Sequence, residues 1–294
     1  MLLHVLHETE YDYQPMVRTA QHMAHLKPCG TGSQKLLSHR LTIDPAPARC
    51  TEALDVFGNT RSFFSLEYSH EFLHVRAESL VQTSAPIQPA NDRLSWEQVA
   101  ERMRYHRTAH YDPATEFAFA SPYVPRDEAF VAYAQESFTQ GRSLLEAGTD
   151  LMQRIHRDFE YEMTATDVNT PALEALELRK GVCQDLAHVM LGCLRSLGLP
   201  ARYVSGYLLT EPPAGQPRLV GCDGSHAWVS LYLPAAQGPG CWVDLDPTNE
   251  RAAGEDYVTL AIGRDYSDVA PIGGVIYASG GQRLEVSVSV VPVE

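Results

Sequence analysis

The sequence predicts an α+β protein in which an all-β module comes first and helices packed on a small antiparallel sheet follow. Up to about residue 85, apolar and polar residues alternate with a period of two. Beyond residue 96, apolar residues recur at three- and four-residue steps. Two prolines, Pro86 and Pro89, interrupt both patterns. We therefore expect a β-sandwich-like domain at 1–85 and a core at 86–294.

The elements can be read in order along the chain. In the first module, alternation separated by turn residues predicts strands at 2–13, 18–26, 36–44, 53–68 and 72–82, with a hairpin tip at 57–60. In the core, helical periodicity is found at 96–105, 127–139 and 143–159, and a short helix follows Thr170-Pro171. Residues 283–293 alternate again and predict a returning C-terminal strand.

A cysteine stands at the start of the next predicted helix, in the run Gly-Val-Cys-Gln-Asp-Leu-Ala-His that begins at Gly181. Apolar residues recur from Leu186 to Leu197, so Cys183 lies in the first turn. Free N–H groups and the helix dipole favour an anion there, which makes Cys183 a candidate nucleophile rather than core filling. Its own N–H is a candidate oxyanion donor. On a helical wheel, Asp185 and His188 fall on the opposite, outer face.

A predicted antiparallel hairpin supplies a histidine and two aspartates. Residues 225–233 and 241–246 both alternate, and the Pro- and Gly-containing segment between them predicts a loop. One register places His226 opposite Asp246, and a slip of two residues places it opposite Asp244. Parity does not choose between them.

Two tryptophans lie on the same predicted face as the histidine. Trp228 and Trp242 are expected mainly to pack the sheet, and they are also the candidate walls of a substrate cleft beside His226.

A nucleophile, a base and a base-orienting carboxylate in this order suit thiol-dependent acyl transfer. The Cys183 run, Ser-His-Ala-Trp around His226, and Leu-Asp-Pro-Thr-Asn around Asp246 resemble the core of the bacterial transglutaminase-like superfamily. The resemblance implies a papain-like fold, a catalytic set of Cys183, His226 and Asp246, and no cofactor. It selects Asp246 over Asp244, because the third member in that family is the aspartate of Asp-Pro-Thr.

One feature of such enzymes is not found in the sequence. Papain-like enzymes carry a glutamine a few residues before the cysteine, whereas residues 176–180 here contain none. Eukaryotic transglutaminases use an upstream tryptophan, but the only earlier one is Trp96, in a different segment. The side-chain oxyanion donor is therefore unassigned.

Composition limits the partners and the location. The formal net charge of −14 and a pI near 5.3 argue against nucleic acid or an anionic membrane as a partner. No apolar stretch is long enough to span a bilayer, and the first residues lack the features of a signal peptide. Six cysteines are too few to indicate a disulfide scaffold. We expect a cytoplasmic protein whose oligomeric state, homo-oligomer included, is left open.

The predicted reaction is attack on an amide of a peptide or protein substrate. Transfer of the acyl group to water, which we favour, makes the protein a peptidase or amidase. Transfer to a lysine amine makes it a protein-glutamine gamma-glutamyltransferase, and a non-catalytic peptide-binding module is a further alternative. A zinc site is disfavoured, because no Cys-x-x-Cys pair accompanies the four candidate ligands, Cys183, Cys222, His226 and Cys241.

Overall fold

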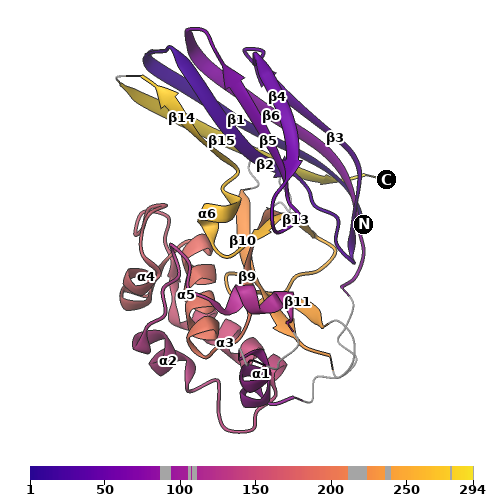
Figure 1. Cartoon of the computed structure of the whole chain (residues 1–294), viewed down its shortest axis with the longest axis vertical. Coiled ribbons are helices and arrows are strands. Elements are labelled where there is room, and N and C mark those ends of the chain that lie inside the picture. Colours follow the sequence, from indigo (N-terminus) through magenta and orange to yellow (C-terminus); the bar gives the residue numbers. More distant parts are fainter. Residues whose placement is uncertain are drawn as a thin grey trace, which may run out of the picture.

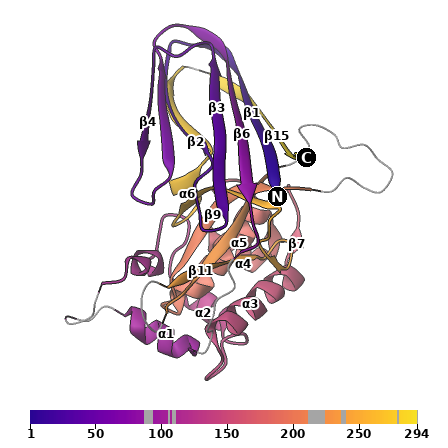
Figure 2. The ribbon, with the colours of Figure 1, turned by 90° about the vertical axis from the view of Figure 1, so that its right-hand side faces the viewer.

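The computed structural model describes residues 1–86, 94–104, 107, 111–210, 224–235, 240–278 and 280–293. The β module consists of two antiparallel four-stranded sheets, in the orders β15-β1-β6-β3 and β14-β2-β5-β4, which face each other across an apolar interior (Figures 1 and 2). Its strands are β1 (Leu2–Val17), β2 (Thr19–Lys27), β3 (Gln34–Asp44), β4 (Arg49–Leu54), β5 (Thr60–Leu66), β6 (His70–Thr83), β14 (Ile272–Tyr277) and β15 (Gly281–Pro292).

The predicted hairpin tip in this module is confirmed. β4 and β5 pair with each other, and the turn between them includes Gly58, whose φ is +86°. Oδ1 of Asp55 accepts hydrogen bonds from the backbone N–H groups of Phe57 and Asn59, at 2.8 and 2.9 Å. The run at 53–68 therefore forms parts of two strands joined by an Asx-type turn.

The C-terminal residues complete the β module rather than the core, which corrects the expected division at 86–294. β15 pairs with β1 along almost its whole length, and β14 pairs with β2. The returning strand was predicted, but its partner was not. Its alternation buries Val288 and Val290 in the interior of the sandwich, where β1 supplies the complementary face.

The core is a five-stranded antiparallel sheet, in the order β12-β11-β10-β9-β13, with helices packed on one face (Figure 1). Helix α5 lies against β9 and β10, and helices α2, α3 and α4 contact α5. The helices are α1 (Trp96–Met103), α2 (Glu128–Ala134), α3 (Leu144–Asp158), α4 (Ala172–Leu178), α5 (Cys183–Ser196) and α6 (Tyr266–Val269), with a 3₁₀ turn at Pro113–Ala118. The strands are β7 (Glu160–Tyr161), β8 (Lys180–Gly181), β9 (Ala201–Leu208), β10 (Ser225–Leu233), β11 (Cys241–Asp246), β12 (Arg251–Ala252) and β13 (Tyr257–Gly263).

The prediction of an outer face on α5 was wrong, because this helix is enclosed on all sides. Asp185, His188 and Arg195 are at most 1% exposed. The ring of His188 lies between those of Tyr123 and Tyr203, with centroid distances of 5.4 and 5.1 Å. Arg195 donates hydrogen bonds to backbone carbonyls, including that of Ala201. Each of these polar side chains is buried and makes a specific contact. The pattern of polar residues along the helix does not predict such contacts.

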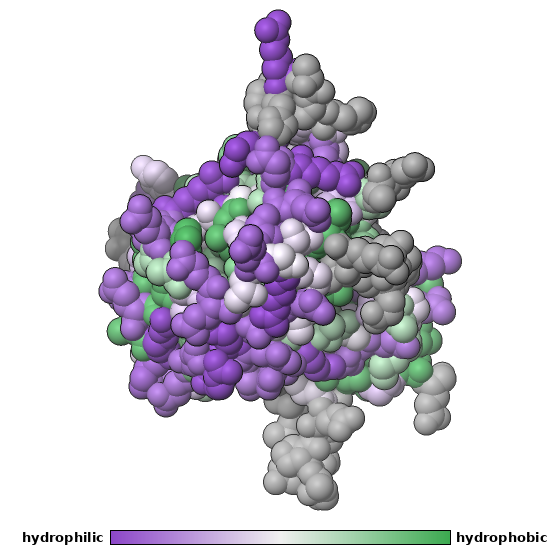
Figure 3. All heavy atoms as spheres, turned by 90° about the horizontal axis from the view of Figure 1, so that it is seen from below, coloured by the Kyte–Doolittle hydropathy of each residue, from purple (hydrophilic) through white to green (hydrophobic). Residues whose placement is uncertain are grey.

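Buried hydrogen bonds join the two modules. Oη of Tyr207, on β9, and Nδ1 of His7, on β1, form a hydrogen bond of 2.9 Å. Nε2 of Gln34 donates to the carbonyl of Thr259 at 2.7 Å, and Oε1 of Gln34 accepts from the N–H of the same residue at 2.8 Å. These contacts hold the β module against the core sheet. Seen from the helical end, the surface is mainly hydrophilic (Figure 3), and within the described ranges no helix is long and apolar enough to cross a bilayer.

Candidate active site

The nucleophile candidate lies at a helix start that a buried carboxylate organises. Cys183 is the first residue of α5 and is half-buried. Oδ2 of Asp185 accepts a hydrogen bond from the N–H of Val182 at 2.8 Å and one from Oγ1 of Thr166 at 2.7 Å. A Cβ at Gly181 would come within 2.5 Å of the same oxygen, so only glycine fits before this turn. Asp185 therefore positions the start of the helix.

His226 and Asp246 form a close pair at the end of the core sheet. Nε2 of His226 is 2.6 Å from Oδ2 of Asp246, and the two side chains are 10% and 0% exposed. Oδ2 also accepts hydrogen bonds from Nδ2 of Asn249 at 2.7 Å and from Oη of Tyr257 at 2.8 Å. Oδ1 accepts from the N–H of Thr248 at 2.8 Å. The carboxylate is thus fixed on both oxygens, which orients the imidazole.

The register of this hairpin differs from both predicted alternatives. Ser230 pairs with Asp244 and Val229 pairs with Leu245, so the continuing register sets Asp246 opposite Trp228. His226 therefore reaches Asp246 along a diagonal of the ladder, a separation that an imidazole and a carboxylate span. The strands close with Leu233 opposite Cys241. The predicted partner was right although the predicted alignment was not.

The electrostatics of the pair favour a charged imidazolium and a carboxylate. Burial alone lowers the pKa of His226, but the hydrogen bond to Asp246 and the interaction with the Cys183 side chain outweigh it and raise the pKa to about 10. Burial alone raises the pKa of Asp246, but the hydrogen bonds from His226, Asn249 and Tyr257 outweigh it and lower the pKa. Since Nε2 faces Asp246, Nδ1 is the nitrogen left for the thiol.

Cys183 and His226 line one cavity of about 410 Å³, which both modules enclose. The core contributes Tyr203 and Ser205 from β9, and α6 contributes Tyr266. The β module contributes a further wall, which includes His7, Thr9 and Tyr11 from β1, Ile272 from β14, and Leu284, Val286 and Val288 from β15.

Tyr203 is the side chain near the thiol that sequence reasoning missed. It is 2% exposed, and burial, followed by the negative charge of Cys183, raises its pKa well above the ordinary value. Its hydroxyl is therefore a protonated donor at neutral pH. Tyr257 and Asn249 were missed as well. Asn249 could have been found from the Asp-Pro-Thr-Asn run, which places it three residues after Asp246. Tyr257 lies on a separate strand, β13, and no local sequence pattern indicates that it contacts Asp246.

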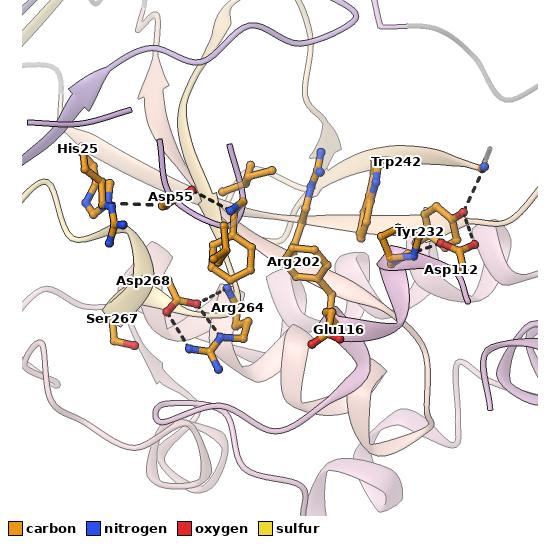
Figure 4. Close-up of a pocket in the computed structure, with 18 of the residues that line it drawn as sticks. His25, Asp55, Asp112, Glu116, Arg202, Tyr232, Trp242, Arg264, Ser267 and Asp268 are labelled. Carbon is orange, nitrogen blue, oxygen red and sulfur yellow. Dashed lines mark hydrogen bonds and ion pairs between the residues drawn. The ribbon is translucent and has the colours of Figure 1, made fainter. Parts of the chain in front are cut away.

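The two tryptophans do not lie where a substrate role requires them. Trp228 is fully buried and packs edge-on against Tyr257, with ring centroids 5.2 Å apart. Trp242 lines a different cavity, of about 930 Å³, where the guanidinium of Arg202 lies 4.2 Å from its ring centroid (Figure 4). Neither side chain reaches the cavity of Cys183, so we correct the substrate-binding prediction for both. The cause is their position along the strands: Trp228 lies two residues beyond His226 on β10, where Tyr257 packs against it, and Trp242 lies four residues before Asp246 on β11.

The zinc alternative gains no support from the described ranges. No group of three or more potential ligands is found there. Cys241 lies opposite Leu233, seven residues along β10 from His226, which corresponds to roughly 23 Å at the rise of a strand. Cys222 lies outside the described residues.

Comparisons with known proteins identify the family and the fold. Residues 3–82 match the bacterial transglutaminase-like N-terminal region, and residues 131–247 match the transglutaminase-like superfamily. An uncharacterized protein of Mycobacterium tuberculosis is 38% identical over 294 residues, which cover 99% of this chain and 92% of that relative. A protein-glutamine gamma-glutamyltransferase of Pseudomonas aeruginosa is 31% identical over 172 residues, which cover 56% of this chain and 25% of that enzyme.

Among solved structures, a "Putative Cysteine Protease" from Cytophaga hutchinsonii matches with a TM-score of 0.72 and 19% identity, over 100% of this chain and 92% of that chain. The fold is therefore that of a transglutaminase-like protein with an N-terminal β module. The chain belongs to the transglutaminase-like superfamily.

Proposed function

We propose that the protein is a thiol-dependent peptidase or amidase with Cys183 as the nucleophile, His226 as the acid and base, and Asp246 as the orienting carboxylate. The observation that carries the proposal is the 2.6 Å pair of His226 and Asp246, whose imidazole shares a cavity with a cysteine at a helix start. This geometry places a charged imidazole and a cysteine at one site, the combination that nucleophilic catalysis by a thiol requires.

The first half of the reaction forms a thioester. The sulfur of Cys183 attacks the amide carbonyl, and the N–H of Cys183 together with the hydroxyl of Tyr203 would bind the resulting oxyanion. The C–N bond then breaks as His226 gives its proton to the leaving amine. Asp246 stays ionised throughout and holds the imidazole in place.

The second half releases the acyl group. Water attacks the thioester carbonyl, His226 takes the proton of that water, and the C–S bond breaks to give a carboxylic acid and the free thiol. A lysine amine in place of water would give an isopeptide, and the 31% identity to the Pseudomonas glutamyltransferase over 172 residues makes this the second candidate.

Mass spectrometry of a peptide library can separate the two outcomes. Peptides are incubated with the protein in H₂¹⁸O, with and without a primary amine, and Cys183→Ala protein serves as the control. We expect cleaved products that carry one ¹⁸O in the new carboxyl group. Amine adducts on glutamine without cleavage would support the transferase instead, and identical product patterns with the Cys183→Ala protein would refute both.

A further inference from the structure

The inner face of one β-module sheet is uncovered beside the candidate active site. Alternate residues of β15 share a face, and on that face Val288 and Val290 are at most 1% exposed. Leu284 and Val286 lie on the same face, yet they are 50% and 51% exposed. The sandwich is therefore open at this end of β15, and two aliphatic side chains line the opening.

The opening leads to the thiol. Leu284 and Val286 line the cavity of Cys183, together with Ile272, the first residue of β14. A second hollow, of about 340 Å³, begins at Tyr11 and Ile272, which it shares with the first, and continues past glycines of both strands. The two hollows form one slot between β14 and β15.

Both strands that border the slot are sheet edges. β15 ends the order β15-β1-β6-β3 and β14 ends the order β14-β2-β5-β4, so within the described sheets neither strand has a partner on its outer side. An edge strand presents backbone N–H and C=O groups that an extended chain can pair with. The slot is therefore bordered by two strand edges with which a bound peptide would form main-chain hydrogen bonds.

The chemical character of the lining limits what the slot can hold. Among the described residues that line the two hollows, none is Asp, Glu, Lys or Arg, although the whole chain carries a net charge of −14. The imidazolium of His226 is already paired with Asp246, so a charged side chain placed further along the slot would lose its hydration without gaining an ionic partner. The net charge also disfavours a second copy of the chain as the occupant, because like-charged surfaces repel.

We infer that the acyl donor is an extended peptide whose aliphatic side chains, close to the attacked carbonyl, lie on Leu284 and Val286 in the slot between β14 and β15. This inference rests on the proposed function and assigns its substrate class. The β module is then the specificity element of the enzyme, since it supplies the apolar wall while the core supplies the thiol, the imidazole and the carboxylate.

Two matched substitutions test the inference. Val286→Lys places a charge in the slot, whereas Val275→Lys places one on β14 at a side chain that is 75% exposed and lines neither hollow. Cleavage is measured on a peptide series with Leu, Ala or Glu flanking the scissile bond. We expect Val286→Lys to lower kcat/KM for the Leu peptide by more than about tenfold and to reduce the preference for Leu over Glu. Val275→Lys should leave both unchanged.

Two further measurements distinguish failure of this inference from failure of the proposed function. Alkylation of Cys183 by iodoacetamide needs no peptide site, so its rate should stay within about twofold in both variants. Binding of a fluorescently labelled Leu peptide is measured in the Cys183→Ala background, where no turnover is needed. Adding Val286→Lys should weaken this binding, and adding Val275→Lys should not. Equal binding of Leu and Glu peptides, or an equal loss in both variants, would overturn the inference. So would a dimer, seen by sedimentation, that only Val286→Lys dissociates.

Discussion

Asp246 meets His226 across a diagonal of the β10–β11 ladder, two residues away from the position directly opposite the histidine. Continuing the register of β10 and β11 places Trp228 opposite Asp246, and the buried ring of Trp228 stands 6.0 Å from that of His226. Asp244 lies two pairs further along, opposite Ser230. Asp246 is therefore close enough to hold the imidazole of His226, whereas Asp244 lies too far along the strand.

Asp246→Asn is therefore expected to reduce turnover by several orders of magnitude, because an amide permits the wrong imidazole tautomer. Asp244→Asn should change turnover by less than about threefold, since Asp244 is too far along the strand to reach His226. Steady-state kinetics of both folded variants, measured on one substrate, check this. A larger loss from Asp244→Asn would show that the carboxylate role belongs to the other aspartate.

Cys183→Ala and His226→Ala should each remove nearly all activity, by about 10³-fold or more, because the three groups act as one unit. Both side chains are partly accessible, so the fold should persist. Circular dichroism and the thermal midpoint verify folding, and kcat/KM measures the loss. Substantial turnover by either purified, folded variant would contradict the proposed mechanism.

Local sequence pattern was sufficient to find the three residues of the candidate site. Cys183 at a helix start, His226 entering a strand and Asp246 leaving the next one each have a signal within a few residues. The register was not predictable in this way, because side-chain parity has a period of two and a slip of two residues preserves it. The match of the Asp-Pro-Thr motif, rather than geometry, selected Asp246, the aspartate that contacts His226 in the structure.

Contacts between distant segments account for what the sequence could not predict. The alternation of β15 predicted a strand, but only the assembled sandwich shows that β1, some 280 residues earlier, is its partner. Likewise, the polar residues Asp185 and His188 look like a solvated helix face, whereas the fold encloses both. Burial of polar residues depends on hydrogen-bond partners from other elements, and no periodicity in α5 encodes those partners.

Tyr207→Phe should destabilise the contact between the modules. The substitution removes the hydroxyl that hydrogen-bonds with Nδ1 of His7. Burial lowers the pKa of His7 to about 4, so the imidazole is neutral and its buried Nδ1 loses this partner. Leaving a buried donor or acceptor unpaired costs about 1–3 kcal/mol. Tyr277→Phe is the control, because Tyr277 is 72% exposed and such changes stay within about 0.5 kcal/mol. Urea denaturation measures both, and equal stabilities would show that the buried hydrogen bond contributes nothing.

Tyr203→Phe tests the proposed side-chain oxyanion donor. The ring stays and only the hydroxyl is lost, so packing against His188 should be preserved. Removal of one oxyanion donor typically lowers kcat by about 10²–10³-fold, and we expect a loss in kcat rather than an increase in KM. The iodoacetamide rate of Cys183 should not change, because alkylation forms no oxyanion. An unchanged kcat would assign oxyanion binding to backbone N–H groups alone.

The pH dependence follows from the shifts of the ion pair. The raised pKa of His226 keeps the imidazolium, the proton donor to the leaving amine, until the pH approaches about 10. Activity should therefore persist well above pH 6.5 and fall as pH rises through that pKa.

The stability of the fold should depend on pH in the same direction. The contribution of the raised His226 pKa is fully present below about pH 6.5 and is lost as pH rises through the folded-state pKa. The lowered pKa of Asp246 adds the opposite limb, a loss of stability as pH falls through the folded-state value of that carboxyl. Asp246→Asn removes the largest raising contribution, so the alkaline limb should move toward lower pH. NMR titration of His226 in both proteins measures this directly, and an identical midpoint in the two would show that the carboxylate does not set the charge of the imidazole.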